Sequence, residues 1–492
     1  KANFYERGEK PLEIVTSRQW YIRNGGRDAE LNAELIERGR QVDFHPAFMR
    51  ARYENWVAGL NGDWLISRQR FFGVPIPVWY PVDEHGETVW GKPLLPSEDV
   101  LPVDPAAQSP DGYDESQRGE PGGFVGDPDI MDTWATSSLT PQIAAGWIDD
   151  PELFAAVFPM DVRPQGHDII RTWLFSTIVR SHFEFDSVPW RNAALSGWIL
   201  DPERKKMSKS KGNVVTPEDI VKEHSTDAVR YWAASGRLGA DAAYDTGQMK
   251  VGRRLAIKIL NASKFALTFG EAEAGVQHSG EVEGDLAEAV VNPLDKAMLA
   301  GLADVVDKAT AGFQGWDHTR CLEVTETFFW TFCDDYLELV KDRAYGGRGD
   351  VEAASARAAL RLALGVVLRL FAPLLPYVTE EVWSWWHDGS VHRAAWPTAA
   401  DLPVPGGDPV LLTAVGEALA GIRKAKSEAK VGMRAEVAAV TLAGPGGWTD
   451  LVRAAEADLR AAGRVTGTVS YVEDDTVEVR DAQLVPVDRS KG

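Results

Sequence analysis

The sequence is organised around one cationic stretch, Lys205-Lys206-Met207-Ser208-Lys209-Ser210-Lys211-Gly212-Asn213. Small polar residues separate its lysines, and a helix start follows, with Thr216 as the N-cap and Pro217 in the first turn. Ammonium groups on such a loop suit a polyphosphate, because they can follow charge that moves during a reaction. A solvated lysine run or a general nucleic-acid patch is the alternative that composition alone leaves open.

The totals describe a chain of two to four domains. It has 492 residues, of which 44% are hydrophobic and 25% charged, which is enough for several cores. No apolar run is long enough for a membrane, and two cysteines, Cys321 and Cys333, fit a reduced cytoplasmic protein without structural zinc. The net charge of −21 opposes general attraction to RNA. A basic stripe can nevertheless act locally, within a Debye length of ~8 Å.

The residues before the cationic stretch predict the second half of a parallel nucleotide-binding sheet. Residues 193–200 have the pattern of a strand that ends at the stretch, and an apolar helix is expected over 169–179. Gly166 permits close backbone approach, and Asp168 could bond a pair of ribose hydroxyls or serve only as a helix N-terminal carboxylate. Ligands of such sheets lie at the carboxyl ends of the strands.

The first 125 residues mix helix and strand patterns. A helix is expected over Asp28 to Arg38, and Phe44-His45-Pro46 is expected to begin a second helix that continues to Trp56. Residues 63–80 combine aromatic and cationic side chains with Gly and Pro, which is compatible with a buried edge strand and a turn. The following residues, 81–125, are rich in Pro, Gly and acid and predict loops with a short hairpin.

From about residue 250 the pattern becomes helical. A bundle of four or five helices is predicted, followed by a Pro/Gly linker at 399–409 and a tail of helix, strand, helix, strand and strand. Two basic runs in the tail, 423–426 and 430–434, could contact RNA or only be solvated. The expected bundle segments are 253–261, 294–310, 319–340, 355–371 and 377–386, and those of the tail are 411–426, 435–442, 448–462 and two strands within 465–487.

Several motifs, in order along the chain, resemble the class I aminoacyl-tRNA synthetases, and the valyl type in particular. Residues 206–210 resemble the second signature of this class, the mobile loop that handles ATP phosphates. Residues 63–80 resemble the segment that re-enters the catalytic domain after the editing insertion, and Asp132-Thr133-Trp134 resembles a valyl stretch that differs in isoleucyl enzymes. The resemblance covers residues 1 to about 400. The tail departs from it, because no sustained heptad repeat of a coiled coil is visible.

The resemblance implies an α/β fold with three parts. They are the second half of a class I Rossmann-like catalytic domain, an all-α anticodon-binding bundle and a small α/β C-terminal appendage. The expected bounds are 1–50 for a re-entry segment, 51–250 for the catalytic half with insertion 81–125 and loop 206–210, 251–400 for the bundle, and 401–492 for the appendage.

The activity that the resemblance implies is valine–tRNA ligation, with ATP and Mg²⁺, L-valine and tRNA(Val) as partners, in a cytoplasmic monomer. Lys206 and Lys209 would stabilise the leaving pyrophosphate. The valine pocket would be lined by Phe72, Ile130 and Trp134, with Phe72 where many relatives have tryptophan. ATP contacts are expected from Gly166, His167, Asp168, Trp198, Ile199, Met207, Ser208 and Ser210.

The first signature of the class, His-x-Gly-His, has no match among the nine histidines, and the sequence begins at Lys1 without methionine. We therefore expect a C-terminal portion that lacks the first signature and the editing domain and is inactive by itself. An isoleucyl-type synthetase, or a non-catalytic tRNA-binding paralogue or fragment, is the alternative. Arg253, Arg254 and Lys258 on the bundle are expected to contact RNA phosphates.

Overall fold

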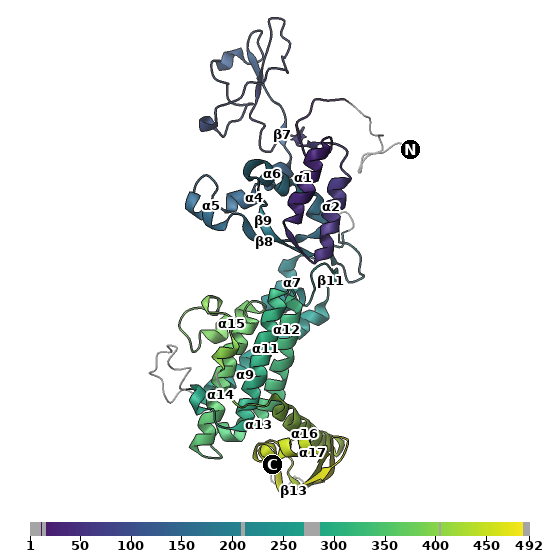
Figure 1. The fold of residues 1–492 in the computed structure, drawn as a ribbon, viewed down its shortest axis with the longest axis vertical. Coiled ribbons are helices and arrows are strands. Elements are labelled where there is room, and N and C mark those ends of the chain that lie inside the picture. Colours follow the sequence, from purple (N-terminus) through teal and green to yellow (C-terminus); the bar gives the residue numbers. More distant parts are fainter. Residues whose placement is uncertain (1–10, 12–15, 208–211, 270–285, 403–404, 486–492) are drawn as a thin grey trace. The chain divides into compact units, whose positions relative to one another are not determined.

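A computed structural model describes residues 11, 16–207, 212–269, 286–402 and 405–485 (Figure 1). The chain divides into two compact units, each with its own core. The first comprises residues 1–198 with 238–240, and the second comprises 199–237 with 241–492. Within the described residues, no helix combines the length and the apolar character that crossing a bilayer requires.

The first unit is built on a parallel sheet of three strands in the order β2-β9-β8. These strands are β2 (Asp43–His45), β9 (Trp190–Ser196) and β8 (Met160–Gly166). Their apolar side chains form one core with α1 (Ala29–Arg40), α2 (Arg50–Ala58) and α6 (Phe175–Phe185). The predicted parallel sheet, with helices packed on it, is therefore confirmed.

The prediction that Phe44-His45-Pro46 begins a helix was wrong. Phe44 and His45 belong to β2, where they lie opposite Ala193 and Ala194 of β9. Phe44 is buried in the core of the unit, and after Pro46 a short 3-10 turn (Ala47–Met49) leads into α2. Helix α2 thus begins at Arg50, four to six residues later than predicted. The reason is that Asp43–His45 pair with β9, a strand that is distant in the sequence.

Residues 64–131 form antiparallel pairs joined by long loops. Strand β4 (Ser67–Arg68) pairs with β7 (Ile130–Met131), and β5 (Trp79–Pro81) pairs with β6 (Phe124–Gly126). Between β5 and β6 the chain forms loops, two short 3-10 turns and a bridge between Val82 and Thr88, around a small core that contains Trp79 and Phe124. Loops with a short hairpin were expected for 81–125.

The second unit contains a helical bundle (Figure 1). Helix α12 (His318–Thr331) continues through a wider π turn (Phe332–Tyr336) into α13 (Leu337–Ala344), so the predicted helix 319–340 is one continuous rod with a local irregularity. Among the described residues, the other helices of this unit with eight or more residues before residue 400 are α7 (Pro217–His224), α8 (Thr226–Ala234), α9 (Thr246–Leu267), α11 (Pro293–Gln314), α14 (Asp350–Phe371) and α15 (Pro376–Trp383).

The tail forms a three-stranded sheet with helices against it. The strand order is β13-β12-β14, with β13 parallel and β14 antiparallel to β12. The predicted helix at 448–462 is broken at Ala455 into two; otherwise the predicted order is confirmed. The elements are α16 (Pro409–Glu428), β12 (Val437–Gly444), α17 (Gly446–Ala454), α18 (Glu456–Gly463), β13 (Val465–Glu473) and β14 (Glu478–Leu484).

A buried ionic network joins the bundle to the tail. Arg343 is fully buried and donates to both carboxylate oxygens of Asp295 on α11, at 2.7 and 2.8 Å, and to Asp458 on α18 at 2.8 Å. The hydroxyls of Tyr336 and Ser355 donate to Asp295 as well, at 2.7 and 2.6 Å. Removing one partner of such a network leaves a buried charge uncompensated, at a cost of about 3–5 kcal/mol.

The basic runs of the tail do not form one solvated patch. Lys426 is buried, and its ammonium donates to the carbonyl oxygens of Met433 and Gly463 at 3.1 and 2.8 Å. Burial lowers the pKa of this lysine from its ordinary value of 10.5. Arg423 donates to the carbonyl oxygen of Asp334 at 2.8 Å. Lys424 and Lys430 are exposed, so only part of the predicted patch faces solvent.

Candidate functional site

The carboxyl ends of β8 and β9 lie side by side, where Gly166 pairs with Ser196. A side chain at position 166 would place its Cβ 2.8 Å from Oδ1 of Asp168, which is closer than such atoms approach. The carboxylate of Asp168 can therefore fold back over the strand end only because residue 166 is glycine. Asp168 is exposed, so its carboxylate is available to a hydroxyl donor from outside.

His167 is held between two elements of the first unit. Arg52 on α2 lies 2.9 Å from Nδ1 of His167, and the ring of Trp198 lies 5.0 Å from the imidazole ring. Because a guanidinium can only donate, Nδ1 must accept, and the hydrogen of the neutral imidazole is then on Nε2. One turn further along α2, the ring of Trp56 lies 5.7 Å from the guanidinium of Arg171. Helix α2 thus orients the turn that follows β8.

Strand β8 also carries a buried arginine, Arg163, that the sequence pattern did not identify. Arg163 on β8 packs against the ring of Trp173 and donates to Oε1 of Gln165 at 3.2 Å. Among the described residues, its Nη2 atom has no hydrogen-bond partner. Burial lowers the pKa of this guanidinium to about 9. No sequence signal identifies such an arginine, because its burial depends on helix packing behind the sheet.

The residues expected to line an amino-acid pocket lie around the β4–β7 pair. Ile130 packs directly on the backbone of Gly73, where a Cβ would come within 2.2 Å of the isoleucine Cδ1. Phe72 precedes that glycine and is 90% exposed. Trp134 is half-buried in the first turn of α3 (Thr133–Ser137). The loop that carries Phe72 therefore contacts Ile130 through Gly73, whereas the Phe72 ring extends into solvent. Trp134 follows Ile130 in the sequence and lies in the first turn of α3.

An ion pair connects strand β4 to the residue that precedes α3. Arg68 on β4 lies 3.1 Å from the carboxylate of Asp132, which is buried and directly precedes α3. The same stretch is held by backbone bonds, since the amide of Met131 donates to the carbonyl oxygen of Val74 at 2.7 Å. Arg68 and Asp132 are thus positioning residues for the Ile130–Trp134 segment. The sequence showed their presence but not their pairing.

In the second unit, Asp201 closes the cationic stretch at both ends. Its carboxylate accepts from the amides of Glu203 and Lys205, at 3.0 and 2.7 Å, and from the side chain of Asn213 at 2.8 Å. The bond from Asn213 is the main reason that the pKa of this carboxyl group lies below its ordinary value. Asp201 was missed in the sequence, although a carboxylate directly after a strand was a usable signal. Asp201 thus connects the described residues on either side of the stretch, Lys205 and Asn213.

The lysines of this stretch are only partly within the described residues. Lys206 is exposed and Met207 half-buried, whereas Ser208, Lys209 and Ser210 lie outside the described residues. Ile199 belongs to the short strand β10 (Ile199–Leu200), which pairs with β11 (Ala242–Ala243). The predicted helix start is confirmed, since α7 begins at Pro217 with Thr216 as the N-cap, although the threonine side chain makes no capping hydrogen bond.

The three cationic residues of the bundle that are expected to contact RNA differ in exposure and in hydrogen bonding. Lys258 donates to Asp334 at 2.9 Å and lies 5.6 Å from the ring of Trp330, so its charge is already paired. Arg254 is exposed. Arg253 is exposed as well, with one weak bond of 3.3 Å to the carbonyl oxygen of Glu223. Lys258 is therefore the weakest of the three as a phosphate ligand.

Two family models match the chain. The model "tRNA synthetases class I (I, L, M and V)" matches residues 8–245, and "Anticodon-binding domain of tRNA ligase" matches residues 295–442. Among curated proteins, the valine–tRNA ligase of Thermobifida fusca is 62% identical over 490 residues, which are 99% of this chain and 54% of the relative. That of Salinispora tropica is 59% identical over 96% of this chain and 56% of the relative. The chain spans about half the length of the curated relatives it matches.

Two solved structures illustrate the likeness in fold. An Agrobacterium radiobacter K84 LeuRS, in a ternary complex with tRNA and LeuAMS, matches 87% of this chain and 46% of its own, with a TM-score of 0.52 and 19% identity. The Mycobacterium tuberculosis methionyl-tRNA synthetase with methionyl-adenylate matches 77% of this chain and 64% of its own, with a TM-score of 0.52 and 20% identity. At these identities the likeness establishes the fold alone.

Proposed function

Because the chain belongs to the class I tRNA synthetases, we propose that it acts in the ATP-dependent activation of valine and in its transfer to tRNA. The observation that carries the proposal is the identity of about 60% to valine–tRNA ligases over nearly the whole chain. The Asp132-Thr133-Trp134 stretch supports the valine assignment over an isoleucine one. The matched anticodon-binding domain supports tRNA as the partner.

The first step is the attack of the valine carboxylate on the α-phosphorus of ATP. A carboxylate oxygen bonds to phosphorus, and the bond from that phosphorus to pyrophosphate breaks, with both electrons leaving on pyrophosphate. We assign stabilisation of this leaving group to Lys206 and Lys209, because ammonium groups offset the charge that develops on its oxygens. Mg²⁺ enters as the companion of ATP, whose phosphate oxygens are its usual ligands.

We assign the adenosine to the end of β8. The exposed carboxylate of Asp168 can accept from ribose hydroxyls, and Gly166 lets the nucleotide approach the backbone. His167, whose ring is oriented by the bond from Arg52, is assigned to the same nucleotide. The remaining assignments to ATP are Trp198, Ile199, Met207, Ser208 and Ser210.

The amino acid is assigned to Phe72, Ile130 and Trp134. Arg68 and Asp132 hold this segment, so the pocket shape depends on their ion pair. In the second step a terminal ribose hydroxyl oxygen of tRNA bonds to the valyl carbonyl carbon. AMP leaves and the hydroxyl proton is released. The tRNA itself is assigned to the bundle, and Arg253 and Arg254 are its phosphate contacts.

The test is pyrophosphate exchange into ATP by the complete translated protein that contains this chain. Exchange should require valine and should be at least tenfold slower with isoleucine, because a hydrophobic pocket rejects one additional methylene by about 10- to 200-fold. Charging of tRNA(Val) transcripts should follow the same preference. A protein that binds tRNA without any exchange would be a non-catalytic relative, and faster exchange with isoleucine would assign a different amino acid.

A further inference from the structure

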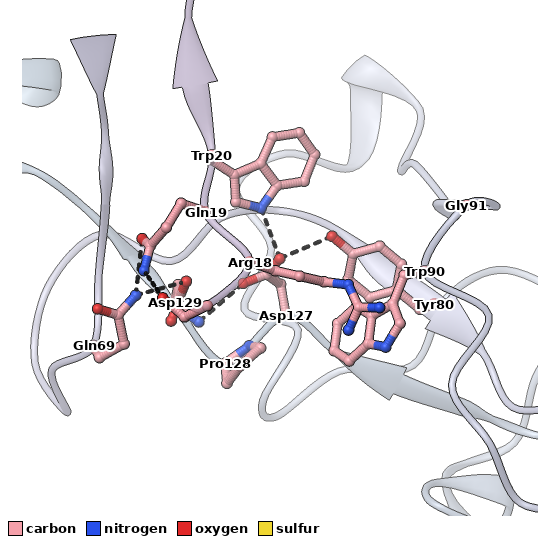
Figure 2. A pocket seen from close by; sticks show the side chains of 11 residues that line it. Arg18, Gln19, Trp20, Gln69, Tyr80, Trp90, Gly91, Asp127, Pro128 and Asp129 are labelled. Atoms are coloured by element: carbon pink, nitrogen blue, oxygen red, sulfur yellow. Dashed lines mark hydrogen bonds between the residues drawn. The ribbon is translucent and has the colours of Figure 1, made fainter. Parts of the chain in front are cut away.

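The segment 127–138, which carries two of the residues assigned to the amino acid, is fixed at its start by a buried carboxylate. Asp127 is 8% exposed and accepts from the indole of Trp20 at 2.8 Å and from the hydroxyl of Tyr80 at 3.0 Å. Figure 2 shows both side chains directed at this carboxylate. They line a polar cavity of about 690 Å³ beside Trp90, to which four separate segments of the chain contribute. The start of the segment is therefore anchored in the walls of this cavity.

The short helix α3 follows in the same segment. It has five residues, and Asp132, which directly precedes it, is fixed by its ion pair with Arg68. In so short a helix most carbonyl groups belong to the last turn, where they lack partners within the helix. One of these groups, the carbonyl oxygen of Ser137, accepts from the indole of Trp173 at 2.9 Å. The C-terminal end of α3 thus depends on side chains from other elements.

Arg180 on α6 supplies two more hydrogen bonds to this end. Its Nε donates to the hydroxyl of Ser138 at 3.0 Å, and its Nη2 donates to the carbonyl oxygen of Ala135 at 3.2 Å. The hydroxyl of Ser138 donates in turn to the same carbonyl oxygen at 2.6 Å. Ala135 and Ser138 are 1% and 0% exposed. The guanidinium, the hydroxyl and the carbonyl group therefore form a closed, buried triangle at the end of α3.

The chemistry of this triangle suits an arginine in particular. A guanidinium is planar and presents its donors in a rigid fork, so two acceptors on one element fix its position and its orientation together. A cation also suits the C-terminal end of a helix, where side chains of this kind bond the last carbonyl groups. Arg180 is half-buried, and burial lowers the pKa of its guanidinium, although Glu184 on the same helix opposes this effect.

We propose that Arg180 is a positioning residue that sets the selectivity of the amino-acid pocket. Arg68 and Asp132 fix the start of α3, and Arg180 fixes its end, so the place of the Trp134 indole depends on both. The inference rests on the proposed function, in which Trp134 contacts the amino acid. Arg180 acts on valine only through α3, and a small displacement of a substrate-positioning group is enough to lower the rate strongly.

The test is pyrophosphate exchange by the complete protein that contains this chain, with kcat and KM measured for valine and for isoleucine. Arg180→Ala should raise the KM for valine and lower the valine/isoleucine ratio of kcat/KM by about tenfold, because a well-formed pocket rejects one methylene by only about 10- to 200-fold. The KM for ATP should change little. Arg40→Ala, at an exposed arginine of α1 that pairs with Glu37 and Glu54, is the matched control and should behave as the wild type.

Two further variants separate positioning from folding. Arg180→Lys keeps the charge without the fork and should recover part of the ratio. Ser138→Ala removes one acceptor of the same triangle, so its effect and that of Arg180→Ala should combine to less than the product of the two. Both variants carry the test if Arg180→Ala fails to fold. A purely structural role would lower the number of active sites without changing the ratio or the KM for valine.

The outcomes distinguish this inference from the function on which it rests. An active wild type, with an unchanged ratio and an unchanged KM for valine in the Arg180 variants, would overturn the positioning role alone. Independent effects of the Arg180 and Ser138 substitutions would overturn it as well. Absence of valine-dependent exchange by the wild type would overturn the proposed function, and the positioning role with it.

Discussion

The guanidinium of Arg52 on α2 and Nδ1 of His167 lie 2.9 Å apart, although the two residues are 115 positions apart in the sequence. The bond sets the imidazole as the tautomer with its hydrogen on Nε2 and orients the ring at the end of β8. In the proposed function Arg52 is therefore a positioning residue, because it would act on a nucleotide only through His167.

We expect Arg52→Ala to raise the KM for ATP about tenfold in pyrophosphate exchange, since a hydrogen bond that involves a charged group contributes about 1.5–3 kcal/mol. The KM for valine should change little, because the Ile130–Trp134 segment is held by other residues. Arg52→Lys, which keeps a donor, should restore part of the affinity. Arg191→Ala, at an exposed arginine of β9, is the control. An unchanged KM for ATP would remove the role of this pair.

Lys209→Ala should slow valine-dependent exchange by ~10²–10³-fold, the typical cost of losing one preorganised electrostatic group. The expectation rests on the resemblance of residues 206–210 to the second signature of the class. Lys222→Ala is a suitable control, because Lys222 lies on α7 in an exposed pair with Glu218. If exchange by Lys209→Ala equals that of the control, pyrophosphate is stabilised by other groups.

Trp134→Ala should raise the rate with isoleucine relative to valine. A hydrophobic pocket distinguishes one methylene by only ~1–3 kcal/mol, and a lost indole opens far more space than one methylene fills. The measurement is the ratio of kcat/KM for the two amino acids. A constant ratio, with lower stability, would show that the half-buried Trp134 only packs against its neighbours.

On the bundle, Arg254→Ala should reduce the salt dependence of tRNA binding, whereas Lys258→Ala should not. Each phosphate contact contributes about 0.7 to 0.9 to the slope of log affinity against log salt concentration. Lys258 is bonded to Asp334 and serves as the matched control. The check is a salt series for both variants; equal loss of slope in both would show that the Asp334 pair opens on binding.

Cys321 and Cys333 should resist alkylation in the native protein. Both are buried, and burial raises the pKa of each thiol to about 12 from an ordinary value of 9.0. At pH 8 about one thiol in 10⁴ is then the reactive thiolate. Because the unfolded chain loses these protons at lower pH, it binds fewer protons than the native chain above pH 9, and stability falls as pH rises there. Counting thiols modified by iodoacetamide, with and without urea, tests the first statement, and urea unfolding midpoints measured over a pH series above pH 9 test the second.

The sequence predicted the parallel sheet, the bundle and the order of elements in the tail, because each depends on local periodicity or on ordered motifs. It did not predict the strand at Phe44-His45, since a three-residue strand is set by its partner β9 and not by its own pattern. The ring-to-cation and ion-pair contacts of the site, such as that of Arg68 with Asp132, were invisible for the same reason.

Charge in the sequence was also an incomplete guide to charge on the surface. Lys426 belongs to a basic run but lies inside the tail, and Lys258 is paired with Asp334. Both side chains were counted as solvent-facing because a lysine in an amphipathic segment normally is. The polar cavity beside Trp90 was missed entirely, since its four segments are spread over more than 100 residues.

The buried network around Arg343 has a consequence for how the chain can change over generations. Asp295 and Asp458 belong to helices α11 and α18, yet both carboxylates are bonded to the same guanidinium, and Asp458 also pairs with Arg348 at 2.7 Å. Loss of Arg343 leaves the buried Asp295 without its cation, and loss of either aspartate leaves donors of the fully buried guanidinium without an acceptor, so each single change favours a second or third substitution. Aligned descendants should therefore keep all three residues or replace them together, and a recombinant that takes the bundle from one lineage and the tail from another should inherit a mismatch wherever the lineages differ here.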